Sequence, residues 1–418
     1  IESILHGGMY LLYTFLLYTG LLLSLPWYAL KFRKYFPTLK DRLGFLKLTR
    51  LQRSVWVHAV SVGEVKSVSK LIARLRASHP GQPLVVSTTT PAGQDLARSM
   101  AGMADHVFFF PLDLPGAIRR TLDRVNPELV LIAETEIWPN FLRECRKRNT
   151  RVVLVNGRIS DRSFPRYRAV RRWLKHVLDD FTLLGMQTET DRERIQSIGA
   201  DGRKVTVFGN LKFDALEPEH ALEPELSERL GRLSRLWIAA STMPGEEEQI
   251  LDAFSELRKS HADLTLLIAP RHADRFDSVE RLIRSRGFSY ARRSRMSTSE
   301  DVAVLLLDSL GELASTFRHA AIVFVGGSLV PKGGHNILEP AAFANPIVFG
   351  PHMENFREIR DAFLKARAAV EVQNAVDLAR VLDRLLNDPR AANELGANAR
   401  QVVEQNAGAT ERVLAYLQ

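Results

Sequence analysis

Cysteine is nearly absent from this chain, since Cys145 is the single one in 418 residues. One cysteine excludes an internal disulfide and a cysteine-based metal site, and this usage is typical of a reducing compartment. No GxxxxGK[ST] motif occurs, which argues against a P-loop nucleotidase. His272 and His335 have no partner ligands at metal spacing, so we expect no metal and no cofactor.

The overall composition is typical of a globular protein, and the chain carries an excess of positive charge. Hydrophobic residues make up 45% and charged residues 25% of the chain, which excludes a disordered protein. The length predicts two domains and an extra segment. A formal net charge of +9 favours an anionic partner, either nucleic acid, an anionic membrane surface or a phosphorylated substrate. Charge alone does not choose among these partners.

The N-terminal segment reads as a membrane anchor. Residues 7–30 carry no charge, and as a helix they are about long enough to cross a hydrocarbon core of roughly 30 Å. The positive charges follow the apolar run instead of preceding it, unlike a signal peptide, and place the downstream chain in the cytoplasm. We therefore predict a single N-terminal anchor, residues 1–45, that either spans the membrane or enters one leaflet. Its candidate interfacial side chains are Tyr10, Tyr13, Tyr18, Trp27 and Tyr28.

After Phe45, short apolar runs alternate with helical patterns, which predicts an α/β fold. The expected strands of the first half are 55–58, 84–87, 106–110, 129–133, 152–155, 181–185 and 205–208, and those of the second half are 237–240, 264–269, 302–307, 322–325 and 346–349. Residues 216–226 read as a linker. We expect two Rossmann-like, doubly wound domains facing a cleft, residues 46–214 and 215–400, followed by a C-terminal helix at 401–418. Ligands of such sheets bind beyond the carboxyl ends of the strands.

Polar clusters follow several strands of the first half. Ser61-Val62-Gly63 forms a tight turn before Glu64, which either complements a helix dipole or serves as a general base. Glu134 and Glu136 precede Trp138-Pro139 and either cap a helix or line a site. Two basic residues also follow strands, Arg158 and Lys212, and we expect Lys212 to reach an anion at the interdomain cleft.

The strand ends of the second half gather groups that suit a nucleotide. Backbone amides in glycine-rich turns and an arginine favour phosphate, and an acid favours ribose hydroxyls. A helix is expected from Ile337 to Phe343, directly after the Gly-Gly turn. The candidate residues are Ser241, Arg271, His272, Gly327, Gly333, Gly334, Asn336 and Glu339.

A basic stretch between residues 158 and 175 interleaves arginines with aromatic residues. It is either a solvated helix face or a contact surface for lipid headgroups or acceptor phosphates. Nucleic acid is a third reading that a preceding membrane anchor disfavours.

In order along the chain, these motifs resemble the Kdo (3-deoxy-D-manno-octulosonic acid) transferases of Gram-negative bacteria, which are membrane-associated glycosyltransferases of the two-domain GT-B type. The resemblance runs from about residue 10 to about residue 410. It is carried by Ser61-Val62-Gly63-Glu64, Glu134-Thr135-Glu136-Ile137-Trp138-Pro139-Asn140, Asn156-Gly157-Arg158, Gly209-Asn210-Leu211-Lys212-Phe213-Asp214, Pro270-Arg271-His272, Gly326-Gly327-Ser328 and Gly333-Gly334-His335-Asn336-Ile337-Leu338-Glu339-Pro340.

The resemblance implies an inverting, metal-independent transfer of Kdo from CMP-Kdo to the 6'-hydroxyl of a lipid A precursor (lipid IVA). It takes place at the cytoplasmic face of the inner membrane. Glu64 is then the catalytic base. The donor residues are those gathered in the second half together with Lys212, and the acceptor residues are Ser61, Gly63, Glu134, Glu136 and Arg158. Inner-membrane lipids are expected partners and nucleic acid is not.

Two other functions stay open at this point. Another membrane-anchored GT-B transferase with a UDP-sugar donor would share the fold, the anchor and the glycine-rich loop. A membrane-tethered protein that binds nucleotide or glycolipid without turnover is the non-enzymatic reading, and Glu64 speaks against it.

Overall fold

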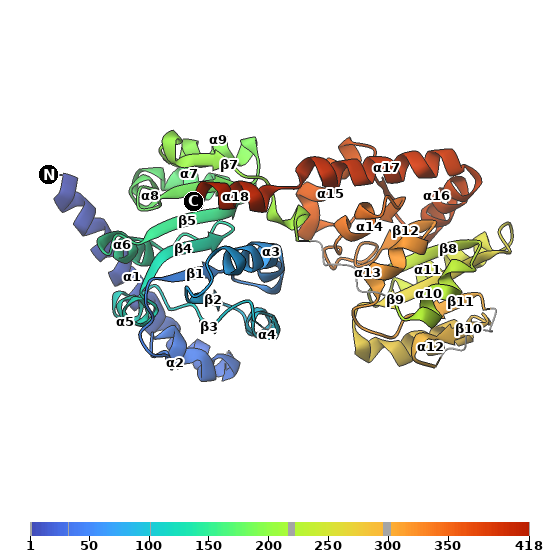
Figure 1. Cartoon of the computed structure of the whole chain (residues 1–418), viewed down its shortest axis with the longest axis horizontal. Helices are drawn as coiled ribbons and strands as arrows, with labels where there is room; N and C mark the ends of the chain where they lie inside the picture. The colour runs from blue at the N-terminus through green and yellow to red at the C-terminus, as the bar shows by residue number, and fades with distance from the viewer. Residues whose placement is uncertain (1, 32, 101, 216–221, 296–301, 418) are drawn as a thin grey trace. The chain divides into compact units, whose positions relative to one another are not determined.

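The computed structural model describes residues 2–31, 33–100, 102–215, 222–295 and 302–417, without the side chains of 2–7, 25–31 and 33–35. The chain divides into two compact units, residues 1–215 with 407–418, and residues 216–406. Each unit contains a seven-stranded, entirely parallel sheet (Figure 1). Residues 216–221 of the expected linker lie outside the described part of the chain.

The first sheet has the strand order β3-β2-β1-β4-β5-β6-β7. Its strands are β1 Ser54–His58, β2 Leu84–Thr88, β3 His106–Phe109, β4 Pro127–Ala133, β5 Arg151–Gly157, β6 Leu183–Met186 and β7 Val205–Val207. The helices of this unit are α1 Glu2–Lys31, α2 Leu39–Arg42, α3 Val62–Ser78, α4 Pro91–Ser99, α5 Pro115–Val125, α6 Pro139–Lys147, α7 Phe164–Ala169, α8 Arg171–Leu178, α9 Glu189–Ile198 and α18 Ala409–Leu417. All seven predicted strands are confirmed, because continuous apolar runs are buried on both faces of a parallel sheet.

The second sheet has the order β10-β11-β9-β8-β12-β13-β14. Its strands are β8 Arg235–Thr242, β9 Leu264–Pro270, β10 Tyr290–Arg292, β11 Val304–Leu306, β12 Ile322–Val325, β13 Ile347–Phe349 and β14 Val370–Glu371. The helices are α10 Pro224–Gly231, α11 Glu247–Leu257, α12 Phe276–Ser285, α13 Leu313–Thr316, α14 Leu338–Ala342, α15 Arg357–Lys365, α16 Ala375–Asn387 and α17 Pro389–Asn406. The five predicted strands are present, and the edge strands β10 and β14 were not predicted.

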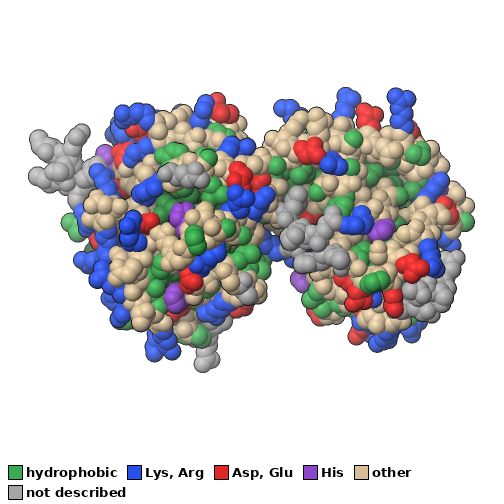
Figure 2. All heavy atoms as spheres, viewed as in Figure 1, with side chains coloured by type: hydrophobic (Ala, Val, Ile, Leu, Met, Phe, Trp, Pro, Cys, Tyr) green, Lys and Arg blue, Asp and Glu red, His purple; other side chains and the backbone are tan. Residues whose placement is uncertain are grey.

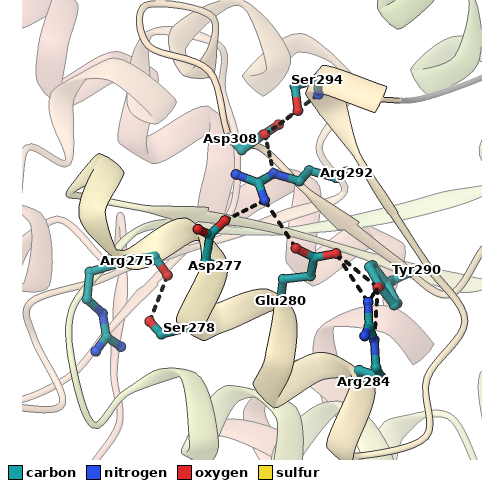
Figure 3. A network of polar contacts seen from close by, with 9 residues as sticks. All are labelled: Arg275, Asp277, Ser278, Glu280, Arg284, Tyr290, Arg292, Ser294 and Asp308. Carbon is teal, nitrogen blue, oxygen red and sulfur yellow. Dashed lines mark hydrogen bonds and ion pairs between the residues drawn. The ribbon is translucent and has the colours of Figure 1, made fainter.

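Strand β10 escapes prediction because it is short and polar. Arg292 on this strand bonds to Asp277 at 2.6 Å and to Glu280 at 3.1 Å, and it also pairs with Asp308 (Figure 3). These partners come from α12 and from the loop after β11. They accept hydrogen bonds from the half-buried guanidinium and balance its charge. Tertiary ion pairs, and not apolar periodicity, therefore place this edge strand.

The C-terminal segment differs from the single helix expected at 401–418. Helix α17 ends at Asn406, and α18 begins at Ala409 after Gly408, whose φ is +88°. Asp214 accepts hydrogen bonds from the backbone N–H of Gly408 and of Thr410, both at 2.6 Å. The end of the chain therefore returns to the first unit.

The N-terminal segment forms α1, a 30-residue helix from Glu2 to Lys31 that lies beside α6 (Figure 1). Across the described residues, no helix combines the length and the apolar character needed to cross a membrane, which corrects the spanning form of the predicted anchor. Tyr10 and Tyr13 are also not interfacial, because their hydroxyls donate to Asp180 at 2.7 Å and Asp113 at 2.9 Å. The predictions for Trp27 and Tyr28 concern side chains outside the described part.

Candidate active site

Glu64 lies at the start of α3, directly beyond the carboxyl end of β1. Its Oε2 accepts a hydrogen bond of 2.7 Å from the N–H of Val60, and its Oε1 accepts one of 3.0 Å from the hydroxyl of Ser61. Burial raises the pKa of Glu64 to about 7, although the Val60 amide opposes the shift. A half-buried carboxylate with a pKa near neutrality is suited to accept a proton.

Two more carboxylates lie at the neighbouring strand end, because β1 pairs with β4 at the point where the strand order reverses. Glu134 follows β4 with a φ of +57°, an uncommon conformation that aims this residue away from the strand path. Burial and the charge of Glu134 raise the pKa of Glu136 to about 7. The charges of Glu134 and Glu136 also contribute to the raised pKa of Glu64, so the three carboxylates interact electrostatically.

Lys212 and Arg158 contact the segment that carries these acids. Lys212 Nζ lies 3.8 Å from Glu134 Oε1, an ion pair within the first unit that the sequence did not predict. The backbone N–H of Arg158 donates a 2.8 Å hydrogen bond to Thr135 Oγ1, and the same hydroxyl donates to the Arg158 carbonyl. The structure therefore brings Glu64, Glu134, Glu136, Arg158 and Lys212 into one region.

Ser61 and Gly63 complete this turn. Ser61 is the N-cap of α3 with extended backbone, and its hydroxyl binds Glu64. Gly63 is exposed, and a Cβ built on it would meet only Ser61 Oγ at 3.9 Å. The fold thus leaves open space at Gly63.

The candidate donor residues gather at the corresponding point of the second sheet, where β8 pairs with β12. Ser241 at the end of β8 has a φ of +56°. Gly326, directly after β12, comes so close to it that an added Cβ would lie 2.5 Å from the Ser241 carbonyl oxygen. Only glycine permits this approach of the two backbones.

Arg271 and His272 follow β9 and are exposed. Burial, and then the positive charges of Arg271 and His272, lower the pKa of His335 to about 4. The three side chains are therefore close enough to interact, and His335 is neutral at physiological pH. The sequence assigned the Gly333-Gly334-His335-Asn336 turn to the phosphate end of the donor, and the structure adds that the His335 imidazole is buried and lies near Arg271 and His272.

The glycine-rich segment uses its amides differently from the prediction. The N–H of Gly327 donates at 2.6 Å to the carboxylate of Glu246, and the N–H of Gly334 donates at 2.8 Å to the Gly327 carbonyl. These two N–H groups are thus hydrogen-bonded within the protein, which corrects the expectation that they donate hydrogen bonds to a phosphate. Gly333 has a φ of +88° and packs against Asn355, so its conformation requires glycine.

The helix after this turn is also shorter than expected. Instead of running from Ile337 to Phe343, α14 has five residues and begins at Leu338. Asn336 Oδ1 accepts the Leu338 N–H at 3.1 Å, and its amide nitrogen donates to Glu339 Oε1 at 3.0 Å. Asn336 therefore binds the first N–H of the helix and orients Glu339.

Metal ligation is not a feature of the described residues, since no three His, Cys, Asp or Glu side chains among them are grouped to hold an ion.

The chain is similar to known proteins over most of its length. The family model of 3-deoxy-D-manno-octulosonic-acid transferases (kdotransferases) matches residues 37–215. A 3-deoxy-D-manno-octulosonic acid transferase of Haemophilus influenzae is 35% identical over 395 residues, which are 93% of this chain and 92% of that protein. One of Bordetella pertussis is 34% identical over 396 residues, covering 91% of both chains.

A solved structure of UDP-GlcNAc 2-epimerase from Neisseria meningitidis, with UDP-GlcNAc bound, has a TM-score of 0.59. The match covers 88% of this chain and 99% of that one at 14% identity, a likeness that shows the fold alone. The matches to the transferases extend over nearly the whole chain. The chain therefore belongs to the 3-deoxy-D-manno-octulosonic acid transferase family, whose members are glycosyltransferases, and has the GT-B fold.

Proposed function

We propose that this protein transfers Kdo from CMP-Kdo to the 6'-hydroxyl of a tetra-acylated lipid A precursor, lipid IVA, in lipopolysaccharide biosynthesis. Membership of the transferase family supports the donor sugar. The observation that carries the mechanism is the carboxylate of Glu64, held by two hydrogen bonds at the carboxyl end of β1 and shifted to a pKa of about 7.

In the proposed reaction Glu64 accepts the proton of the acceptor hydroxyl while the oxygen attacks the anomeric carbon of Kdo. The bond between that carbon and the phosphate oxygen breaks, and CMP leaves with the electron pair. Attack opposite to the leaving group inverts the anomeric centre. A pKa near the working pH makes this carboxylate a stronger base than an exposed glutamate.

The second unit is proposed to bind the donor. Arg271 supplies positive charge for the CMP phosphate or the sugar carboxylate, and the neighbouring His272 supplies a hydrogen-bonding imidazole. Glu339, oriented by Asn336, accepts hydrogen bonds from the ribose hydroxyls. Ser241, Gly327, Gly333 and Gly334 form the close backbone approaches that shape this region. Lys212 of the first unit is the further cation proposed for an anionic donor group.

The first unit is proposed to bind the acceptor. Gly63 leaves room beside Glu64, and Ser61 orients that base. Arg158 supplies a positive charge for an acceptor phosphate, since the precursor carries two phosphates. Glu134 and Glu136 keep the pKa of Glu64 high through their own charge.

We further propose that α1 attaches the protein peripherally to the cytoplasmic face of the inner membrane. Its outward face is apolar, which is the reverse of a helix on a water-exposed surface. The exposed side chains on this face are Leu11, Leu12, Phe15, Leu16, Leu22 and Leu23, all more than half accessible. Tyr10, Tyr13 and Thr14 on the opposite face bind the first unit through their hydroxyls.

The basic stretch lies next to this helix, because the ring of Trp173 packs on Tyr13 of α1 with centroids 5.6 Å apart. Its aromatic residues pack against the core, whereas its basic side chains from Arg162 onward are exposed. Elsewhere, Lys and Arg are scattered over both units on the face that Figure 2 shows, so the net charge does not gather in one patch there. We assign the exposed cations beside α1 to anionic lipid headgroups. They are Arg162, Arg166, Arg168, Arg171, Arg172 and Lys175.

The test is incubation of the detergent-purified protein with CMP-Kdo and lipid IVA, followed by mass measurement of the lipid. A mass increase by one or more Kdo units is expected. Absence of product from folded protein with intact donor overturns the donor assignment, and UDP-sugars are then the next donors to assay.

A further inference from the structure

Glu246 is a fully buried carboxylate that the proposed mechanism does not use. Its Oε2 accepts hydrogen bonds from the N–H of Gly327 at 2.6 Å and of Met243 at 2.9 Å. Its Oε1 accepts from Ser328 at 2.9 Å and from Leu329 at 2.8 Å. Four backbone amides thus converge on one side chain that is 0% exposed.

The amides of Gly327, Ser328 and Leu329 are consecutive, and such a turn forms a concavity that binds anions. Among the described residues, no ion pair includes Glu246, so the backbone alone compensates its charge. A buried charge without partners is costly, and the carboxylate and the turn therefore require each other. The turn is filled by the protein's own anion and is not open to a phosphate.

This turn connects directly to the candidate donor region. The carbonyl of Gly327 accepts the N–H of Gly334 at 2.8 Å. A Cβ on Gly327 would lie 3.0 Å from two ring atoms of His335, so the imidazole packs against this glycine. The Nε2 of His335 is buried without a hydrogen-bond partner in the described structure, although it neighbours Arg271.

We propose that Glu246 is a positioning residue for donor binding: by holding the turn at residues 327–329 it sets Gly334 and His335 in the conformation that receives the nucleotide of the donor. This inference rests on the proposed function, because the nucleotide is that of CMP-Kdo. Glu246 itself touches no substrate, and its effect passes through the backbone of the turn.

The adjacent Glu247 provides a matched control. It is equally buried and belongs to the start of the same helix, but it accepts from Thr242 Oγ1 at 3.1 Å and from Arg275 Nη2 at 3.1 Å. In the described part of the chain, neither of these two contacts of Glu247 involves the turn. Both substitutions remove a buried carboxylate, and only one of them disturbs the turn.

The experiment compares Glu246→Gln with Glu247→Gln in the full chain. In Glu246→Gln, the side-chain NH₂ faces two backbone N–H donors, so two of the four hydrogen bonds to the backbone are lost. We expect its affinity for CMP, measured by calorimetry, to fall about tenfold or more with the KM for the lipid acceptor unchanged. Glu247→Gln is expected to lose stability but to keep its CMP affinity within about twofold.

An unchanged CMP affinity in Glu246→Gln, or an equal loss in both variants, overturns the positioning role. If Glu246→Gln does not fold, Glu246→Asp replaces it, because it keeps the charge but its shorter side chain cannot reach all four amides. The same loss of CMP affinity is expected.

A second readout separates this proposal from the proposed function. The imidazole ¹⁵N resonances of His335 are expected to shift in Glu246→Gln and to stay in place in Glu247→Gln. If the native protein binds no CMP, the donor assignment fails, and the His335 resonances still decide whether Glu246 positions this region. Unshifted resonances in Glu246→Gln overturn the positioning role.

Discussion

The hydroxyl of Tyr13 on α1 donates a 2.9 Å hydrogen bond to the carboxylate of Asp113, which is buried in the first unit. The same carboxylate accepts the backbone N–H of Asn140 at 3.0 Å and of Phe141 at 2.8 Å at the start of α6. Helix α6 directly follows the segment that carries Glu134 and Glu136. Through Asp113, helix α1 is therefore linked to the start of α6, next to the segment that carries these two carboxylates.

Replacing Tyr13 with Phe removes the hydrogen bond between α1 and Asp113. The buried Asp113 loses a donor, and we expect the free energy of unfolding to fall by about 1–3 kcal/mol, as measured by denaturant titration. Tyr18→Phe is the control, since Tyr18 lies on the same helix and is 50% exposed. Equal stability of the two variants would contradict the structural role of the Tyr13 hydroxyl.

Substitutions on the outer face of α1 are expected to lower membrane affinity without lowering the stability of the fold. Leu22 and Leu23 are 71% and 77% exposed, so changing both to Ser removes little packing. Partitioning onto anionic vesicles should fall about tenfold or more, because burial of each leucine in lipid contributes about 1.5–3 kcal/mol. Leu310→Ser, at a residue 77% exposed in the second unit, should leave vesicle binding unchanged. Equal binding of both variants would exclude this face as the attachment surface.

Glu64→Gln is expected to lower the turnover rate by about 10²–10⁴-fold, because the amide cannot accept the proton of the acceptor hydroxyl. Donor affinity should persist, since Glu64 belongs to the first unit. The control Glu228→Gln removes an exposed carboxylate paired with Arg232 on α10 and should retain full activity. A fully active Glu64→Gln would remove this residue as the base.

The raised pKa of Glu64 predicts opposite pH dependences of activity and stability. As a base it works when deprotonated, so turnover should fall as the pH drops below about 7. The folded state holds the proton more tightly than the unfolded chain, whose glutamate has a pKa of 4.5, so this group's contribution to stability is lost as the pH rises from about 4.5 to about 7.

Glu64→Gln should therefore gain stability relative to the native protein over that interval, by about 1–3 kcal/mol after allowance for solvent screening. Denaturant titrations of both proteins at pH 5 and pH 8 measure the difference. A constant difference would show that the pKa of Glu64 is not raised.

Gly63→Ala separates substrate contact from folding. The added methyl group meets only Ser61 Oγ at 3.9 Å, so the stability should stay equal or rise by up to about 1 kcal/mol. The KM for the lipid acceptor should rise about tenfold, since the methyl group occupies the space beside Glu64. Gly231→Ala, at the end of α10 with nothing within 4 Å, is the control without effect on KM. An unchanged acceptor KM in Gly63→Ala would remove Gly63 from the acceptor site.

The sequence alone determined the α/β class of both units, every strand of the first sheet and the five inner strands of the second. Continuous apolar runs such as Val152–Val155 are local signals, because a strand covered on both faces requires apolar residues at every position. The turn around Glu64 was equally legible, since a glycine and an acid directly after a strand fall at the edge where parallel sheets bind ligands.

The tertiary structure decided which partners each polar group finds. The sequence suggests that Tyr10 and Tyr13 are interfacial, but in the structure their hydroxyls donate to Asp180 and Asp113. It likewise suggests a free N–H at Gly327, but in the structure this N–H donates to Glu246. A hydrogen bond between distant segments leaves no periodicity in the sequence, because its geometry depends on the packing of whole sheets and helices. For this reason the sequence predicted a candidate site at the strand ends, and only the fold assigned hydrogen-bond partners to its polar groups.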